Sequence, residues 1–378
     1  MSEIVRTHSF RAVLATWPLL ALGVALSLLG VLTIHPFDGS PSLAPRQLVF
    51  IAVGIVAYIA VAITDMRFIR RTQVIVAGYL VAVGLLSLVL IVGDVVQGAR
   101  SWFDFGFFSF QPSDLAKLVV IALLAKYFSR RHMEIGYVHH IVISGIYTAA
   151  IVLLILVQPD LGTAAILSVV WFGMVLVSGI SKKHLAAVFL IGLVAAAGLW
   201  SFGLAEYQRT RILAFVNPAA DIRGSGYNAY QATVAAGSGE FFGKGIGYGT
   251  QSKLRFLPEY ETDFIFAAFA EEWGFVGITL LLALYGLLLY QLLKISRLAA
   301  TNFDALFAIG VAILFTAHIG IHAGINLGLL PVTGTTIPFM SSGGSHVLIE
   351  FLALGIVASL SQQGRSVPRD ASQQEYEG

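Results

Sequence analysis

The chain has 378 residues, of which 57% are hydrophobic and 12% are charged. A soluble domain is about 45–50% apolar and about 25% charged, and a core of this size still needs a polar shell. This composition excludes a soluble enzyme, a disordered protein and a disulfide scaffold, so lipid must surround most of the chain. The net charge of +2 excludes a nucleic-acid binder, and the absence of cysteine excludes a thiolate nucleophile and a Cys-ligated zinc site.

Ten apolar stretches are long enough to cross a bilayer, which takes about 20 helical residues. We predict them at 12–34, 47–64, 74–93, 113–128, 138–157, 161–180, 184–202, 264–293, 303–330 and 344–362. The first exceeds a signal-peptide core of about 7–15 residues, so we expect it to be retained. The predicted fold class is an all-α polytopic membrane protein with ten transmembrane helices, which forms a single integral membrane domain over 1–378.

The distribution of Lys and Arg predicts the orientation. In the tails and short loops, 13 of these residues fall on the side of the N-terminus, and only Arg46 and Arg100 fall on the other side. Cytoplasmic loops carry the excess of positive charge. We therefore expect both tails, 1–11 and 363–378, to lie in the cytoplasm.

A loop of 60 residues, 203–262, separates the seventh and eighth spans on the predicted extracytoplasmic side. Loops of this length in compact proteins are usually functional or disordered. Its many Phe and Tyr residues argue against disorder. We expect the loop to fold back onto the outer face of the bundle.

The fourth span opens with Pro112 and Ser113, a helix-start signal in which Ser113 is the expected N-cap. Lys117 lies one turn further in. A helix N-terminus and a lysine together could bind a phosphate at the membrane surface. The alternative is a lysine that only extends its amine to the interface.

Asp160 lies in the tight turn Gln158-Pro159-Asp160 between the fifth and sixth spans. We favour a structural N-cap at this position.

The eighth span is entered through an acidic segment that contains Glu259, Glu261 and Asp263. We expect Asp263 in the first helical turn, with Thr262 as N-cap. The carboxylate could simply complement the helix dipole, or it could be a general base that reaches a hydroxyl of a lipid-anchored substrate. Neighbouring acids raise one another's pKa, which would suit a base.

Glu271 and Glu272 follow inside the eighth span, roughly 12–14 Å deeper at about 1.5 Å per residue. Acids in lipid are costly, so we expect at least one to face protein. Lys117 or a buried arginine is a candidate partner for either.

Four further polar side chains lie in the last two spans. His318 and His322 share one helix face, and His346 and Glu350 share another. They could form a metal site or a proton relay, but interhelical hydrogen bonds are the more common role. The intervening Pro331 to Ser345 stretch predicts a re-entrant or cavity-lining segment.

The glycine-rich run from Gly237 to Gly247 lacks the spacing and the preceding strand of a phosphate loop. We therefore reject a nucleotide site there.

Several blocks together resemble the SEDS family (shape, elongation, division and sporulation). They are Trp102 to Lys117, Gln158 to Thr163, Gly226 to Glu259, Thr262 to Ala267, and Gly328 to Gly334. The motif Gly243-Lys244-Gly245, followed by Gly249-Thr250-Gln251, is most similar to the elongation (RodA) branch rather than the division (FtsW) branch. The chain departs from the family pattern at Ser109, His322, His346 and Glu350.

The resemblance implies a SEDS-type fold and a peptidoglycan glycosyltransferase that polymerises lipid II during cell elongation. It implies that Asp263 is catalytic and deprotonates the acceptor sugar's 4-hydroxyl, and that Lys117 faces a pyrophosphate. We expect further substrate contacts from Arg100, Ser113, Asp160, Glu259, Lys244 and Ser342. A class B penicillin-binding protein, a transpeptidase, is the implied partner.

Three alternatives stay open. The first is a lipid II flippase lined by Lys117, Glu271 and Glu272, and the second is a scaffold that only recruits the penicillin-binding protein. The third concerns metal: no strong ligand set appears at the outer surface, but a magnesium or manganese ion could bridge Asp263 or the pyrophosphate.

Overall fold

A computed structural model describes residues 2–37, 43–96, 99–106, 108–130, 138–217 and 224–363. Of the predicted tail 363–378, Gln363 is the last residue of the last helix, and residues 364–378 lie outside the described residues, as do Arg131, Arg365 and Arg369 of the cations counted for orientation. The predicted tail 1–11 is not separate, because the first helix already begins at Ser2.

Each of the ten predicted spans lies on one helix of the described chain. These helices are α1 (Ser2–Ile34), α2 (Leu43–Ile63), α3 (Thr72–Val92), α4 (Pro112–Ser129), α5 (Val138–Val157), α6 (Leu161–Val177), α7 (Lys182–Gly198), α11 (Ile265–Arg297), α12 (Asn302–Asn326) and α13 (Gly344–Gln363). Short 3-10 helices follow α1 and α2, at His35–Phe37 and Met66–Arg70, and a π-helical turn, Leu199–Gly203, extends α7.

Eight of these helices are long and apolar enough to cross a membrane, by length and composition. The other two, α4 and α6, lie in the interior, where α12 packs against both. Because α4 is mostly buried in protein, Asp114 and Lys117 on it avoid lipid. The fold class predicted from the sequence is thus confirmed, although the chain adds a small antiparallel sheet of β1 (Asp94–Val96), β2 (Ala99–Asp104) and β3 (Ser109–Phe110).

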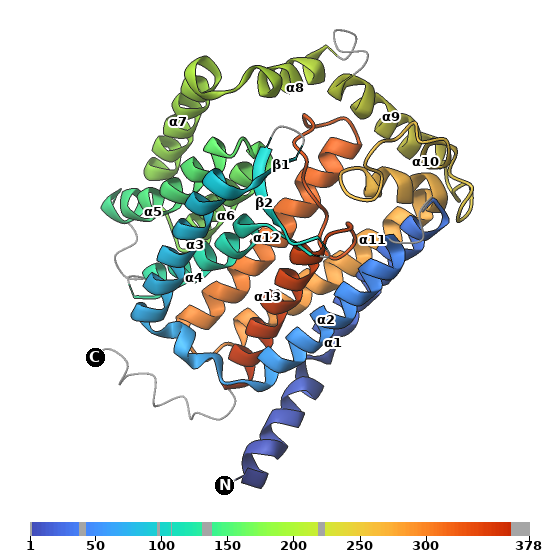
Figure 1. Cartoon of the computed structure of the whole chain (residues 1–378). Coiled ribbons are helices and arrows are strands. Elements are labelled where there is room, and N and C mark those ends of the chain that lie inside the picture. Colours follow the sequence, from blue (N-terminus) through green and yellow to red (C-terminus); the bar gives the residue numbers. More distant parts are fainter. Residues whose placement is uncertain are drawn as a thin grey trace.

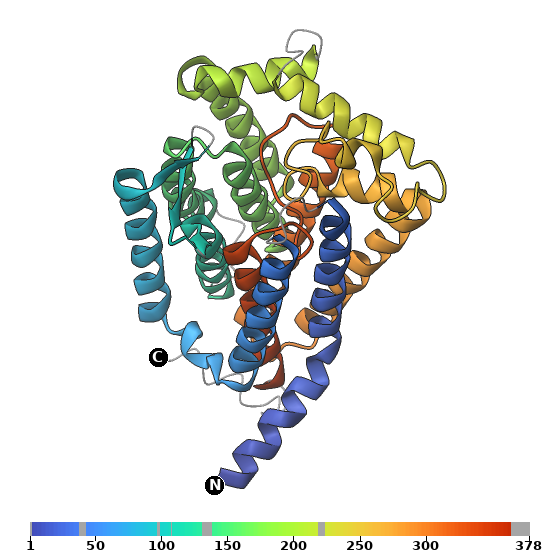
Figure 2. The same cartoon turned by 45° about the vertical axis from the view of Figure 1, so that its right-hand side comes forward.

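The start of α1 and the end of α13 lie at one end of the bundle, and the long loop lies at the other (Figure 1). The described part of that loop forms α8 (Glu206–Val216), α9 (Ser225–Ser238) and α10 (Thr250–Lys253). α8 and α9 lie across the end of the bundle (Figure 2), and α9 packs on α11 and α12. The prediction that the loop folds back is therefore confirmed, and we call this end the loop face.

The glycine-rich run joins α9 to α10 and forms backbone hydrogen bonds with residues on both sides of an interruption in α11. Gly274, with φ +62° and ψ −164°, interrupts that helix. Backbone N–H groups of Lys244 and Gly245 donate to the Glu271 and Glu272 carbonyls at 3.0 Å, and Phe275 N–H donates to the Glu240 carbonyl at 2.9 Å. Backbone groups that the break would leave unpaired in lipid therefore bond to the 239–250 loop.

Two acidic side chains of α11 also hold the 239–250 loop in place. Glu271 is fully buried, and its Oε1 accepts hydrogen bonds from Lys244 Nζ at 2.7 Å and Thr250 Oγ1 at 3.0 Å. Glu272 is also buried and accepts from the Gly247 N–H. Both acids thus face protein, as predicted, but the suggested partner was wrong: Lys244, not Lys117, pairs with Glu271.

A tight backbone approach at Gly243 gives a test of this arrangement. Gly243 has φ +80°, and a Cβ there would lie 2.1 Å from the Glu272 carbonyl oxygen. We expect Gly243→Ala to lower the free energy of unfolding by more than about 2 kcal/mol, because left-handed strain and overlap act together. The thermal unfolding midpoint of the purified protein in detergent measures this change.

Gly237→Ala in α9 is the matched control, since a Cβ there meets nothing within 4 Å. It should be neutral or add up to about 1 kcal/mol of stability, because alanine is the better helix former. Equal unfolding midpoints for the two variants would contradict the proposed close approach.

Candidate active site

Asp263 lies at the loop face, immediately before α11. The helix begins at Ile265 with Phe264 at the N-cap, so Asp263 precedes the first turn and Thr262 is not the cap, contrary to prediction. The Asn326 side chain donates to the Asp263 carbonyl at 3.0 Å and accepts from Ala267 N–H at 2.9 Å. This amide on α12 fixes the backbone that carries the carboxylate.

The surroundings of the Asp263 carboxylate favour its neutral form. Burial raises the pKa of Asp263 to about 7, and the negative charges of Glu259, Asp160 and Glu261 add to the rise, against the opposing effect of Arg211. The group is half-buried and has no ion pair within the described chain. Its Oδ2 faces Gly334, where a Cβ would lie 3.5 Å away.

Asp160 is the second carboxylate of this region. As predicted, it is the N-cap of α6, and its Oδ1 accepts from Thr163 N–H at 2.9 Å. Its Oδ2 accepts from the Gln111 amide at 3.3 Å. Burial raises the pKa of Asp160, and the charge of Lys117 partly offsets the rise.

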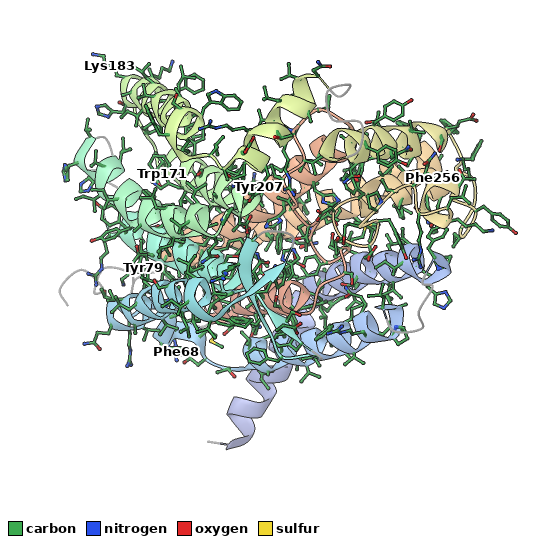
Figure 3. The ribbon with its side chains drawn as sticks, turned by 45° about the horizontal axis from the view of Figure 1, so that its top comes forward. Phe68, Tyr79, Trp171, Lys183, Tyr207 and Phe256 are labelled. Carbon is green, nitrogen blue, oxygen red and sulfur yellow. The ribbon has the colours of Figure 1, made fainter. Side chains whose placement is uncertain are left out.

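Arg211 is a site residue that the sequence analysis missed. It lies on α8, with its guanidinium 5.5 Å from the centre of the Tyr207 ring, and its charge acts on Asp263. The Tyr207 hydroxyl donates to the Pro159 carbonyl at 3.0 Å and so connects α8 to the turn that holds Asp160. Figure 3 shows Tyr207 at the loop face, with Phe256 of the same long loop further along that face.

Lys117 is buried one turn into α4, with a side chain only 5% exposed. Its Nζ lies 2.8 Å from Asp114 Oδ1 and 3.3 Å from His318 Nε2. Asp114 Oδ1 also lies 3.3 Å from His346 Nδ1. The lysine therefore belongs to a buried charge network, and the adjoining cavity has room for about one water molecule.

The remaining predicted substrate residues are spread over the loop face. Gln111, not Ser113, is the N-cap of α4, and the Ser113 hydroxyl is buried with no hydrogen-bond partner among the described residues. Arg100 is exposed on β2, with Nη1 3.5 Å from the Leu90 carbonyl. Glu259 is exposed in the turn before Asp263.

Two more of them are held by structural contacts. Ser342 N–H donates to the Glu261 carbonyl at 2.8 Å, and the Lys244 amine pairs with Glu271 as described above. Glu259 and Asp160 thus lie close enough for their charges to act on Asp263. Lys244 instead lies in the 239–250 loop, where it pairs with Glu271 of α11.

Within the described residues, no group of three or more His, Asp or Glu side chains is arranged to hold a metal ion. His318, His322 and His346 instead make hydrogen bonds to the 331–343 segment.

A family model described as "Cell cycle protein", FtsW/RodA/SpoVE, matches residues 7–366. Stage V sporulation protein E of Bacillus subtilis is 37% identical over 362 residues, 93% of this chain and 96% of the relative. A probable peptidoglycan glycosyltransferase FtsW of Tolumonas auensis is 38% identical over 75% of this chain and 74% of its own. Peptidoglycan glycosyltransferase MrdB of Escherichia coli K12 is 34% identical, over 90% and 92% respectively. Identity alone therefore does not choose among the branches.

Solved structures show the same fold. A chain from a peptidoglycan synthase complex, described for its structural coordination of polymerization and crosslinking, superposes with a TM-score of 0.79 at 32% identity. The rod shape determining protein RodA of Thermus thermophilus superposes with a TM-score of 0.69 at 31% identity. Each match covers 93% of this chain and 98% of the other. By both sequence and fold, the chain belongs to the FtsW/RodA/SpoVE family of cell cycle proteins, the SEDS family.

Proposed function

We propose that this chain is a peptidoglycan glycosyltransferase that polymerises lipid II at the extracytoplasmic face of the bacterial cytoplasmic membrane. The observation that carries the proposal is the Asp263 carboxyl group, which is half-buried at the loop face, has no ion pair among the described residues and has a pKa raised to about 7. A general base works best when its pKa is near the working pH. Relatives that cover most of this chain are named peptidoglycan glycosyltransferases, which supports the same reaction.

The proposed reaction joins two lipid-linked sugars. Asp263 takes the proton of the acceptor's 4-hydroxyl, and that oxygen bonds to the anomeric carbon of the donor. The bond from this carbon to the pyrophosphate oxygen breaks, and the lipid pyrophosphate leaves with its electron pair. Withdrawal of the carboxylate from water makes it a stronger base, because its charged form is less well solvated.

The orientation and cellular role are parts of the same proposal. The excess of Lys and Arg on the opposite end supports an extracytoplasmic loop face. The Gly243-Lys244-Gly245 motif supports the elongation branch and hence a role in rod-shape maintenance. The solved relative from a peptidoglycan synthase complex supports a partner that crosslinks strands, a class B penicillin-binding protein.

Replacement of the base tests the proposal directly. Asp263→Asn should reduce glycan polymerisation from purified lipid II in detergent by at least about a hundredfold, since loss of general-base catalysis costs about 10²–10⁴ in rate. The variant should keep the parent's unfolding midpoint. Gel analysis of labelled glycan strands, with and without the penicillin-binding protein, measures the polymer.

The rivals make different predictions in that assay. A flippase would form no polymer in detergent, where no transbilayer movement exists, even as the parent chain. A scaffold would tolerate Asp263→Asn. Either result would overturn the assignment of Asp263.

The pH dependence of polymerisation tests the raised pKa. The basic form of Asp263 grows as pH rises through about 7, so the rate should climb from roughly a tenth of its maximum at pH 6 to about nine-tenths at pH 8. Glu259→Gln should move this rise to lower pH, because the negative charge of Glu259 raises the pKa of Asp263. Initial rates measured between pH 5.5 and 8.5 give the midpoint.

Glu206 is an exposed acid on α8 that is not among the groups acting on Asp263, so Glu206→Gln is the matched control. It should leave the midpoint unchanged. A flat profile in the parent, or equal shifts in the two variants, would contradict the role of Asp263 as the titrating base.

The proposed contact of Lys117 with pyrophosphate can be separated from its ion pair. Lys117→Ala should raise KM for lipid II about tenfold or more, since a charged hydrogen bond is worth about 1.5–3 kcal/mol. Removing the partner as well, in Lys117→Ala/Asp114→Asn, should not restore KM. Steady-state kinetics of both variants provide the comparison.

Lys126→Ala, in the last turn of the same helix, is the control and should behave as the parent. Recovery of KM in the double variant would show instead that the lysine only neutralises Asp114.

A further inference from the structure

The 331–343 segment between α12 and α13 is irregular and largely buried. At membrane depth, its backbone groups need partners from the protein. Side chains of the flanking helices provide them: His322 Nδ1 lies 2.7 Å from the Thr335 carbonyl, and His318 Nδ1 lies 3.0 Å from the Thr336 carbonyl. Because a carbonyl only accepts, each Nδ1 carries the donated proton.

His346 joins this segment to the buried charge network. Its Nε2 lies 2.6 Å from Thr336 Oγ1 and 2.8 Å from Glu350 Oε1, and its Nδ1 faces Asp114. Because a carboxylate only accepts, Nδ1 donates its proton to Asp114, whereas Glu350 Oε1 accepts no hydrogen bond among the described residues. Lys117 and His346 thus lie beside the buried acids Asp114 and Glu350, which limits the cost of burying them.

Glu350 also holds the segment. Its Oε2 accepts from the Phe339 N–H at 2.6 Å. Tyr285 on α11 donates to the Pro338 carbonyl at 2.6 Å. The middle of the segment is therefore tied to three helices.

The other side of the segment contacts the turn that carries Asp263. Ser341 Oγ donates to the Thr262 carbonyl at 2.9 Å, and Ser342 N–H donates to the Glu261 carbonyl at 2.8 Å. Gly334 faces Asp263 Oδ2. A continuous set of contacts thus runs from the Lys117 network, through the segment, to the Asp263 carboxylate.

We propose that Thr336, His346 and Glu350 are positioning residues that fix the 331–343 segment beside Asp263, so that the carboxylate stays aligned for proton abstraction. This inference rests on the proposed glycosyltransferase function. Thr336 is the central link, because His318 binds its carbonyl and His346 binds its hydroxyl. The three residues touch no reacting atom and act through the geometry of the segment.

Thr336→Val tests the link, since it removes the hydroxyl and keeps the shape of the side chain. We expect kcat for polymerisation of lipid II by the full-length protein to fall about tenfold, with KM within about twofold and the unfolding midpoint within a few degrees. Thr336→Ser, which keeps the hydroxyl, should restore kcat. Thr335→Val is the matched control, because the hydroxyl of Thr335 is buried without a hydrogen-bond partner among the described residues.

The outcomes separate the two proposals. A parent-like kcat in Thr336→Val, a loss equal to that of Thr335→Val, or failure of Thr336→Ser to restore kcat would overturn the positioning role alone. A rise in KM with unchanged kcat would also overturn it, because that pattern indicates lost substrate binding. Absence of polymer from the parent protein would overturn the proposed function and this inference with it.

Discussion

A polar backbone group buried in a membrane protein must find a partner inside the protein, and the loop face depends on how that requirement is met. Two interruptions of helical structure converge there, the break at Gly274 in α11 and the 331–343 segment between α12 and α13. Carbonyl and N–H groups freed at the first are bound by the 239–250 loop, and those at the second by side chains of α11, α12 and α13. The 331–343 segment lies beside the start of α11, where Ser341 and Ser342 donate to the Thr262 and Glu261 carbonyls and so fix the backbone next to Asp263.

Buried acidic side chains also need partners inside the protein. Asp114, Glu271 and Glu350 are buried, and each lies within ion-pair distance of a basic side chain, Lys117, Lys244 or His346 respectively. Such pairing makes burial tolerable without creating reactive groups. Asp263 differs because the nearby charges that act on it are mostly negative, and only Arg211 opposes them. An acid in this position holds its proton more tightly than an ordinary aspartate and exchanges it near neutral pH, which is what acid–base chemistry requires.

Particular residues show how far sequence patterns reach. Asp160 is the helix cap that its turn predicted, because capping depends only on local spacing. Ser113 is not the cap of its helix, since the chain enters α4 two residues earlier, at Gln111. Glu271 pairs with a loop lysine 27 residues away rather than with Lys117. Arg211 carried no signal in the sequence, because nothing in the composition of a long loop tells which of its arginines turns towards the bundle.

Composition and hydropathy by themselves determined the lipid surroundings of this protein, the ten spanning segments that lie on helices of the described chain, and the acidic entry to α11. Every residue of a span must suit either lipid or the protein interior, so these features can be read from local composition. The tertiary structure alone decided which polar groups meet. The partners of Lys117, the roles of the three histidines and the function of the glycine-rich run arise from contacts between helices far apart in the chain. Such contacts depend on how the helices pack. One helix face can pack against many different partners, so no local sequence pattern specifies which residues meet.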